Sequence, residues 1–419
     1  MSAAAWRVQA VAMLTEVADA TRDGPGITRE SYGPGEDAAL QVLERHAAAL
    51  GLACEYDRAR NLWMRLPEDT RPGPVVVIGS HVDSVPQGGN YDGLAGVVAG
   101  MLVLAALRGR HDRGAPLRVL ALRGEESAWY GRAYMGSMAL LGRLPAAALR
   151  LPHRADGGTL GDAMARCGAD VEAIAQGTPL LPCAVAAYLE LHIEQGPVMV
   201  ARGWPVAAVT GIRGNVRHNR VRCIGETGHS GAVPRWLRKD AVLAVSQLLS
   251  RMDEHWRVLL QMGMDLVMTS GICTTPAQSH AVSVIPGEVQ FSFEARSQDA
   301  ATLERFHQLM QAECSAIAAD RGVRFEFDER LTTAPATMDE GWIQRFEAVA
   351  ARAGQTLERI PSGAGHDAAV FAAAGIPAAM LFVRNAHGSH NPQEAMEIDD
   401  FLLGTQWLAE GLLQGPLAD

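Results

Sequence analysis

The fold is decided by the stretch Gly79-Ser80-His81-Val82-Asp83-Ser84-Val85-Pro86-Gln87-Gly88-Gly89-Asn90-Tyr91-Asp92-Gly93-Leu94-Ala95-Gly96. The apolar, β-branched run at 75–78 precedes it and predicts a buried strand. The alanine-rich run at 94–107 predicts a helix packed on a sheet. Between them lies a loop, interrupted by glycines and a proline, that carries a histidine and two aspartates. Such a loop can close short ligating side chains around a small cation.

Three side chains of this loop are candidates for a metal site. His81 can offer an imidazole nitrogen, Asp83 can orient that imidazole, and Asp92 can ligate or bridge metals. The alternative is a polar loop that holds no metal, because a single His-x-Asp pattern is common.

A second acidic motif follows the next predicted strand, Leu117–Leu122, in the sequence Arg123-Gly124-Glu125-Glu126-Ser127. Strand, helix and strand alternate here as in α/β proteins, whose ligand sites lie where strands end. Adjacent carboxylates project to different sides, so one can bind a metal while the other faces a metal-bound water. A bare Glu-Glu pair is usually solvated surface, but its place at a strand end, in step with the His81 loop, favours a functional pair.

Two later histidines follow the same logic. The segment 188–197 alternates apolar and polar residues, which predicts a strand with one wet face. Glu190, His192 and Glu194 share that face, and His192 is a candidate ligand there, although a lone strand histidine is more often structural. Near the end of the chain, a buried strand at 378–383 leads to His390, again just past a strand end.

The pattern of predicted strands and helices changes near residue 211. Strands are predicted at 219–225, 266–269, 288–296 and 323–328, with long helices at 240–261 and 300–320. Two helices laid over four strands make a compact α+β layer of the split βαβ kind. We therefore expect this layer at 212–331 to interrupt a catalytic domain formed by 1–211 and 332–419.

Composition excludes several classes of partner. A length of 419 residues fits two domains, and the net charge of −10 argues against nucleic acid or a membrane surface as a partner. No apolar run approaches the ~20 residues that cross a bilayer, and the N-terminus lacks a secretory apolar segment. Six scattered cysteines without a Cys-x-x-Cys pair suit a reducing compartment. We expect a cytoplasmic protein.

Taken together, the motifs resemble the hydantoinase/carbamoylase family of amidohydrolases, within the clan of aminoacylase and carboxypeptidase-like dinuclear metallohydrolases. That family includes N-carbamoyl-L-amino-acid hydrolases, β-ureidopropionases and allantoate amidohydrolases. Six motifs in the family's order carry the resemblance, at 79–96, 125–126, 190–197, 228–234, 362–368 and 389–394. His192, where peptidase relatives carry an acidic ligand, favours the carbamoylase branch.

The resemblance implies a fold and a cofactor. The fold would be an α/β catalytic domain, with a mixed central sheet flanked by helices, and an inserted ferredoxin-like lid and dimerisation domain. The cofactor would be two divalent metal ions per subunit, zinc, manganese, cobalt or nickel. Asp92 would bridge them, and the other ligands would be His81, Glu126, His192 and His390. Glu125 would be the general base that takes a proton from the metal-bridging water.

The resemblance also implies a small ureido or amide substrate bearing a carboxylate. His229 would stabilise the oxyanion, in its own site or in the partner's site of a homodimer. Gln195 and His366 would line the substrate pocket, and Arg296 would hold the carboxylate. Three departures from the family pattern lie where the substrate would be read: Ser283 in place of an asparagine, Arg235 after the lid motif, and Ser127–Tyr130 after the acidic pair.

The leading hypothesis is hydrolysis of a carbon–nitrogen bond in an N-carbamoyl amino acid or related linear amide. An aminoacylase or dipeptidase would use the same chemistry on a simple amide, and His192 with the Gln195 motif disfavours it. A non-catalytic binding protein could retain the fold, but it would be expected to have lost Glu125 or a ligand, and neither is lost.

Overall fold

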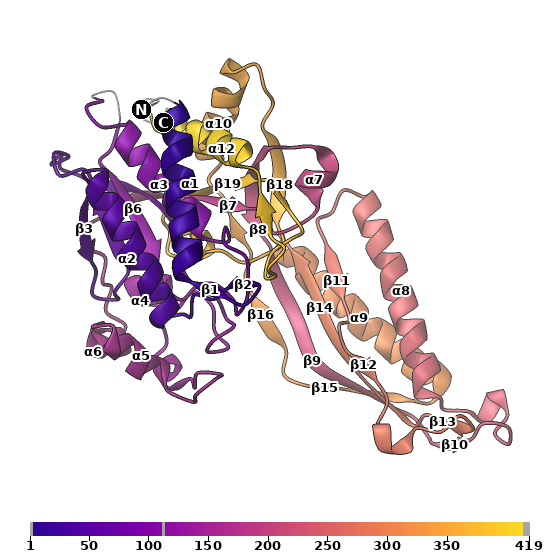
Figure 1. The fold of residues 1–419 in the computed structure, drawn as a ribbon. Helices are drawn as coiled ribbons and strands as arrows, with labels where there is room; N and C mark the ends of the chain where they lie inside the picture. Colours follow the sequence, from indigo (N-terminus) through magenta and orange to yellow (C-terminus); the bar gives the residue numbers. More distant parts are fainter. Residues whose placement is uncertain (1–2, 111–113, 414–419) are drawn as a thin grey trace. The chain divides into compact units, whose positions relative to one another are not determined.

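The computed structural model describes residues 3–110 and 114–413, which form two compact units (Figure 1). The first unit comprises the chain up to Thr210 and from Thr337 onward, and the second is Gly211–Ala336. The domain limits expected from the sequence were 211 and 331. Across the described ranges, no helix is both long and apolar enough to cross a membrane.

A nine-stranded mixed sheet forms the core of the first unit. Its four central strands are parallel and lie in the order β19 (Ala378–Val383), β7 (Val185–Ile193), β5 (Val75–His81) and β6 (Leu117–Leu122). Antiparallel strands flank them, β8 (Val206–Ile212) on β19 and β4 (Leu62–Arg65) on β6, followed by β3 (Ala53–Tyr56). Two further strands pair with β8: β17 (Ala336–Thr337) and β18 (Glu358–Ser362). The mixed central sheet expected from the resemblance is confirmed.

Helices cover both faces of this sheet. Leu191 of β7 lies against Gly404 of α12 (Ile398–Leu412) and Gly96 of α3 (Leu94–Ala106). Tyr188, three residues earlier and therefore on the opposite face, stacks on Phe371 of α11 (Asp367–Ala373). An outer layer consists of α1 (Ala3–Ala20), α2 (Pro34–Ala49) and α10 (Glu340–Arg352), of which α1 packs on α2, α3 and α12. Short elements complete the first unit: α4 (Met135–Leu140), α5 (Leu160–Arg166), α6 (Val171–Ala175), α7 (Val198–Arg202), β1 (Arg22–Asp23), β2 (Gly26–Ile27), β20 (Asn385–Ala386) and β21 (Ala395–Met396).

The prediction of a wet face on the strand around His192 was wrong. From Ala187 to Ile193, β7 is buried on both faces, and the side chains of Glu190 and His192 are only 1% exposed. The cause is tertiary, because α11 covers the face that carries the polar residues. The alternation of apolar and polar residues in β7 therefore corresponds to a buried polar network.

The second unit is a sheet covered by two helices. Its antiparallel strands lie in the order β11 (Val267–Thr269), β14 (Glu288–Ser297), β9 (Gly214–Ile224) and β15 (Arg324–Phe327). The helices α8 (Ala241–Gln261) and α9 (Ala300–Arg321) contact each other and the sheet (Figure 1). Shorter strands pair at the margins: β12 (Cys273–Thr274) on β14, β16 (Leu331–Thr333) on β9, and β10 (Gly228–His229) with β13 (Val284–Ile285).

Candidate active site

The candidate site lies at the carboxyl ends of the four central parallel strands. His81 is the last residue of β5, and His192 is the last but one of β7. Glu125 and Glu126 follow the end of β6, and His390 lies beyond the end of β19. Because parallel strands end at the same edge of a sheet, residues far apart in the chain meet there. The structure thus brings the predicted ligands His81, His192, Glu126 and His390 together around the fifth, Asp92, with Glu125 next to Glu126.

Three buried ligand atoms converge: Nε2 of His81, Nε2 of His192 and Oδ1 of Asp92. The Nδ1 atom of His81 lies 3.0 Å from the carbonyl of Asp83, and that of His192 lies 2.9 Å from the carbonyl of Ile193. With Nδ1 protonated in each ring, both Nε2 atoms carry a lone pair, and that of His192 also lies 3.2 Å from the backbone amide of Gly93, which donates to it. These Nε2 atoms lie 3.3 and 3.2 Å from Oδ1 of Asp92, which is buried and accepts no hydrogen bond from any residue that the structure describes. Two lone pairs and a carboxylate oxygen facing one another fit a cation.

The pKa values of His81 and Asp92 also indicate that this triad favours a bound positive charge. Burial would lower the pKa of His81, but its contacts with Asp83 and Asp92 raise that pKa well above its usual value. Burial would raise the pKa of Asp92, but the neighbouring imidazoles hold it well below the usual range. In the absence of a metal, the site attracts protons to its imidazoles.

A second triad shares Asp92 with the first. The Nε2 atom of His390 lies 3.1 Å from Oε1 of Glu126 and 3.5 Å from Oδ2 of Asp92. The contact with Glu126 raises the pKa of His390 to about 9. Each triad has ligand atoms close enough to share one ion. Two oxygens of one carboxylate therefore face two separate groups of ligands, which is the arrangement that a bridged pair of ions requires.

A third grouping, Glu190, His192 and His366, fits a cation poorly. Oε1 of Glu190 accepts a hydrogen bond from Ser80 Oγ at 2.8 Å, and Oε2 accepts one from the amide of Ala368 at 3.1 Å. His366 is 1% exposed, its Nε2 is bonded to Ser362 Oγ at 2.9 Å, and its ring lies 4.4 Å from that of His192. Burial lowers the pKa of His366 well below its usual value, so this ring stays neutral. The carboxylate oxygens of Glu190 and Nε2 of His366 therefore already have hydrogen-bond partners within the protein.

Glu125 is buried beside the two triads. Burial raises its pKa well above the usual value, and the neighbouring carboxylates Glu126 and Asp367 add to the shift. Its backbone amide and that of Glu126 donate to the two oxygens of Asp83, at 3.0 and 3.1 Å. Asp83 thus holds the acidic pair as well as facing His81, whose Nδ1 lies 3.4 Å from Asp83 Oδ1.

Gln195 contacts the shared carboxylate directly. Its Nε2 donates to Oδ2 of Asp92 at 2.7 Å, while its buried Oε1 has no hydrogen-bond partner within the described ranges. The backbone of Gln195 is left-handed, with φ of 61°, and the backbone of His390 has the same φ. Non-glycine residues adopt this conformation at a cost, which is tolerated where the surrounding structure demands it. The Oε1 atom remains available to a donor from a bound molecule.

Three predicted site residues belong to the second unit. His229 is exposed in β10, where it pairs with Val284 of β13, and Ser283 precedes that strand and accepts a hydrogen bond from the amide of Ser230. Arg296 lies near the far end of β14 and donates to Glu294 at 3.1 Å. The structure therefore brings His229 and Ser283 together, and separates both from Arg296 by roughly the length of β14.

Several side chains that the sequence did not single out support the site. Ser389 donates to Oδ2 of Asp92 and lies 2.6 Å from Oε2 of Glu394, whose Oε1 accepts the amide of Tyr91 at 2.7 Å. Ser389 and Glu394 lie within a motif of the predicted set, so their position was a usable signal. Arg29 and Ser31 also contact the loop, and no local pattern marks them.

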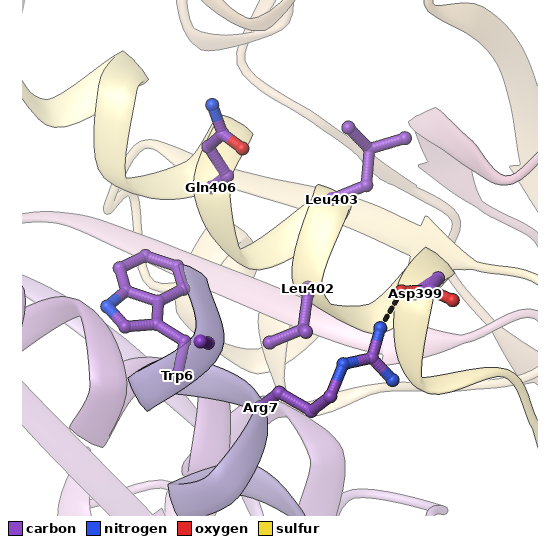
Figure 2. A pocket seen from close by; sticks show the side chains of 7 residues that line it. Trp6, Arg7, Asp399, Leu402, Leu403 and Gln406 are labelled. Carbon is purple, nitrogen blue, oxygen red and sulfur yellow. Dashed lines mark hydrogen bonds and ion pairs between the residues drawn. The ribbon is translucent and has the colours of Figure 1, made fainter. Parts of the chain in front are cut away.

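A hollow of the first unit lies away from these triads. It has a volume of about 540 Å³ and lies between the start of α1 and α12, where Figure 2 shows Trp6, Leu402 and Leu403 around the ion pair of Arg7 and Asp399. This hollow contains none of the candidate ligands. Its one acidic group is neutralised by the arginine, so it does not compete with the triads as a metal site.

Residues 77–414 match peptidase family M20/M25/M40. The chain belongs to this family. It is 33% identical to an allantoate amidohydrolase of Escherichia coli over 394 residues, which cover 93% of each chain. It is 33% identical to an N-carbamoyl-L-amino acid amidohydrolase of Geobacillus stearothermophilus, over 91% of this chain and 92% of the relative. A solved amidase of the hydantoinase/carbamoylase family from Burkholderia multivorans is similar over 97% of both chains, with a TM-score of 0.87 and 27% identity.

Membership places the triads in context, because the M20 family is a family of metal-dependent hydrolases. The protein is therefore a metal-dependent hydrolase that acts on carbon–nitrogen bonds. The resemblance stated from the sequence motifs is confirmed.

Proposed function

We propose that the protein is a dinuclear metal-dependent amidohydrolase that cleaves a carbon–nitrogen bond of an N-carbamoyl amino acid or a related linear amide. The observation that carries the proposal is the pair of ligand triads that share Asp92. His81 and His192 would hold one ion with Asp92, and Glu126 and His390 would hold the other. The orphaned Oδ1 of Asp92 supports this assignment, because a bound cation would satisfy it.

When bound, the two cations would lower the pKa of a shared water and withdraw electrons from the scissile carbonyl. Glu125 takes the proton of the attacking water and later delivers it to the leaving nitrogen. Its burial favours this role, because a carboxyl group with a raised pKa holds a transferred proton more readily than a solvated one. Asp83 keeps Glu125 in place through its backbone amide.

The substrate would be recognised by side chains around this centre. Gln195 would use its unpaired Oε1 to accept a hydrogen bond from the ureido nitrogen, and the buried ring of His366 would form a wall beside His192. Arg296 would bind the substrate carboxylate, with Ser283 in the place of the family's asparagine. His229 would donate to the developing oxyanion.

We further propose that the second unit, with the expected domain limits 212–331, is a ferredoxin-like domain that serves as lid and dimerisation surface. The separation of His229 from Arg296 along β14 supports a dimer in which one chain's His229 serves its partner's site. A cytoplasmic location accords with the six cysteines, all of which are free.

The relatives support a ureido substrate, since those compared above are an allantoate amidohydrolase and an N-carbamoyl-L-amino acid amidohydrolase. The deciding experiment measures ammonia release, with and without added Mn²⁺, from N-carbamoyl-L- and D-amino acids, N-carbamoyl-β-alanine and allantoate. N-acetyl amino acids are assayed in parallel by detection of the free amine. Metal-dependent turnover of one ureido acid supports the proposal. Activity on acyl amino acids alone would instead make the protein an aminoacylase.

A further inference from the structure

Arg29 is a fully buried arginine whose side chain is hydrogen-bonded to the loop 82–92, which joins His81 to Asp92. It lies between β2 and α2 of the first unit and is 0% exposed. Its Nε donates to the carbonyl of Val82 at 2.5 Å, and its Nη1 to Oδ1 of Asn90 at 3.2 Å. Its Nη2 lies 3.4 Å from the carbonyls of Asn90 and Asp92. One rigid, planar group therefore holds both ends of the loop 82–92.

The two ends of this loop carry ligands of the first triad. Val82 directly follows His81, and Asp92 is itself the shared ligand. The loop contains no helix or strand that would fix its length, so the distance between these positions depends on side-chain contacts. The backbone adds to the grip, because the amide of Arg29 donates to Ser84 Oγ at 2.9 Å and its carbonyl accepts the amide of Ser84 at 2.8 Å.

The acceptors of this guanidinium are unusual for a buried arginine. Within the described ranges, all are backbone or amide oxygens, and none is a carboxylate. Burial lowers the pKa of Arg29, and the charges of Glu394, Asp92 and Asp83 oppose that shift from further away. The hydrogen bonds of the side chain thus hold the loop in one conformation. The nearby acidic groups reduce the free-energy cost of burying its charge.

We propose that Arg29 is a positioning residue for the metal centre, and that it sets the spacing between His81 and Asp92 that a divalent cation requires. This inference rests on the proposed metal centre. It concerns the shape of the loop and assigns no contact between Arg29 and the substrate.

Two variants separate positioning from electrostatics. Arg29→Gln removes a positive charge close to a cation site, so electrostatics alone would strengthen metal binding. Arg29→Lys keeps the charge but loses the planar fork that spans the two ends of the loop, so electrostatics alone would leave binding unchanged. Positioning predicts weaker binding in both variants.

The test titrates metal-stripped protein with Mn²⁺ by calorimetry. We expect the dissociation constant to rise about tenfold or more in both variants, as for other residues that orient metal ligands, and kcat to recover in Arg29→Lys at saturating Mn²⁺. The control is Arg123→Lys, because Arg123 is equally buried but pairs with Glu36 and Asp37. It should lower the melting temperature of the stripped protein and leave Mn²⁺ affinity within a few-fold of wild type.

Tighter binding by Arg29→Gln, or unchanged binding by Arg29→Lys, would overturn the inference. If neither variant folds, Asn90→Ala removes one acceptor and should still weaken Mn²⁺ binding several-fold; unchanged affinity there would also overturn it. Wild-type protein that binds no Mn²⁺, Zn²⁺, Co²⁺ or Ni²⁺ would instead reject the proposed metal centre, so the two failures are distinguishable.

Discussion

The carboxylate of Asp83 accepts a hydrogen bond from the backbone amide of Glu125 over 3.0 Å. Asp83 follows β5 and Glu125 follows β6, so this bond joins the ends of two neighbouring strands. The other oxygen of Asp83 accepts the amide of Glu126 and the hydroxyl of Ser31. One buried carboxylate therefore fixes the acidic pair relative to His81, the last residue of β5.

The first prediction concerns this carboxylate. Asp83→Asn would turn an amide nitrogen towards a backbone N–H that needs an acceptor, which leaves a buried donor unpaired. We expect about a 10- to 100-fold loss in Mn²⁺ affinity or kcat, as for residues that orient metal ligands. Calorimetry and steady-state kinetics measure both. Ser31→Ala removes only one donor to Asp83 and is the matched control; an equal loss in both variants would count against the role of Asp83.

The second prediction separates the two glutamates. Glu125→Gln should reduce turnover by about 10²- to 10⁴-fold, because an amide cannot carry the proton, and should leave metal content near wild type. Glu126→Gln should lose metal, because it removes a carboxylate of the second triad. Elemental analysis and turnover are measured on both proteins. The opposite pattern would mean that the two roles are exchanged.

Local patterns predicted the elements that carry the site. The strands at 117–122 and 378–383 follow from apolar runs closed by polar residues, whereas the strand predicted at 75–78 extends three residues further and ends at His81. Because these runs sit in an alternating strand–helix order, the meeting of distant ligands at one sheet edge could also be expected. The α/β fold with a mixed sheet was confirmed.

Features that depend on tertiary cover could not be predicted. The polar face of β7 is buried because α11 lies on it, and helix placement is not written in the strand's own pattern. An arginine-rich run that includes Arg213 and Arg222 could be interpreted as a solvated edge strand. Arg222 belongs to β9, which lies inside the second sheet, whereas Arg213 directly precedes this strand, and both arginines are paired with acids. Arg29 grips residues more than fifty positions away, and no periodicity signals such a contact.

The third prediction tests the carboxylate grip. Arg296→Ala should raise KM for a carboxylate-bearing substrate by about 10- to 100-fold, the range expected for loss of a charge-assisted hydrogen bond. The fold should persist, since Arg296 is half-buried on a strand that keeps its backbone pairing. Kinetics on an acid and its neutral amide analogue form the measurement, and only the acid should lose affinity. Unchanged kinetics would mean that another arginine, Arg213 or Arg235, binds the substrate carboxylate.

The last prediction concerns acid stability of the second unit. His307 of α9 is buried, and its Nε2 lies 3.0 Å from Nε2 of His218, whose Nδ1 contacts Asp328 at 3.0 Å. Burial, followed by the charges of Arg330 and His218, lowers the pKa of His307 to about 4.

An unfolded chain binds a proton at this histidine below its ordinary pKa of 6.5, whereas the folded chain does so only near 4. The unfolded state therefore holds more protons between these values, and the free energy of unfolding falls as the pH drops from 6.5 towards 4. His307→Gln keeps a hydrogen-bonding group facing His218 but cannot titrate. Urea unfolding of metal-stripped protein at pH 7, 5.5 and 4.5 should show a shallower pH dependence in this variant than in wild type. Parallel curves for the two proteins would show that His307 is not an acid-sensitive element of this fold.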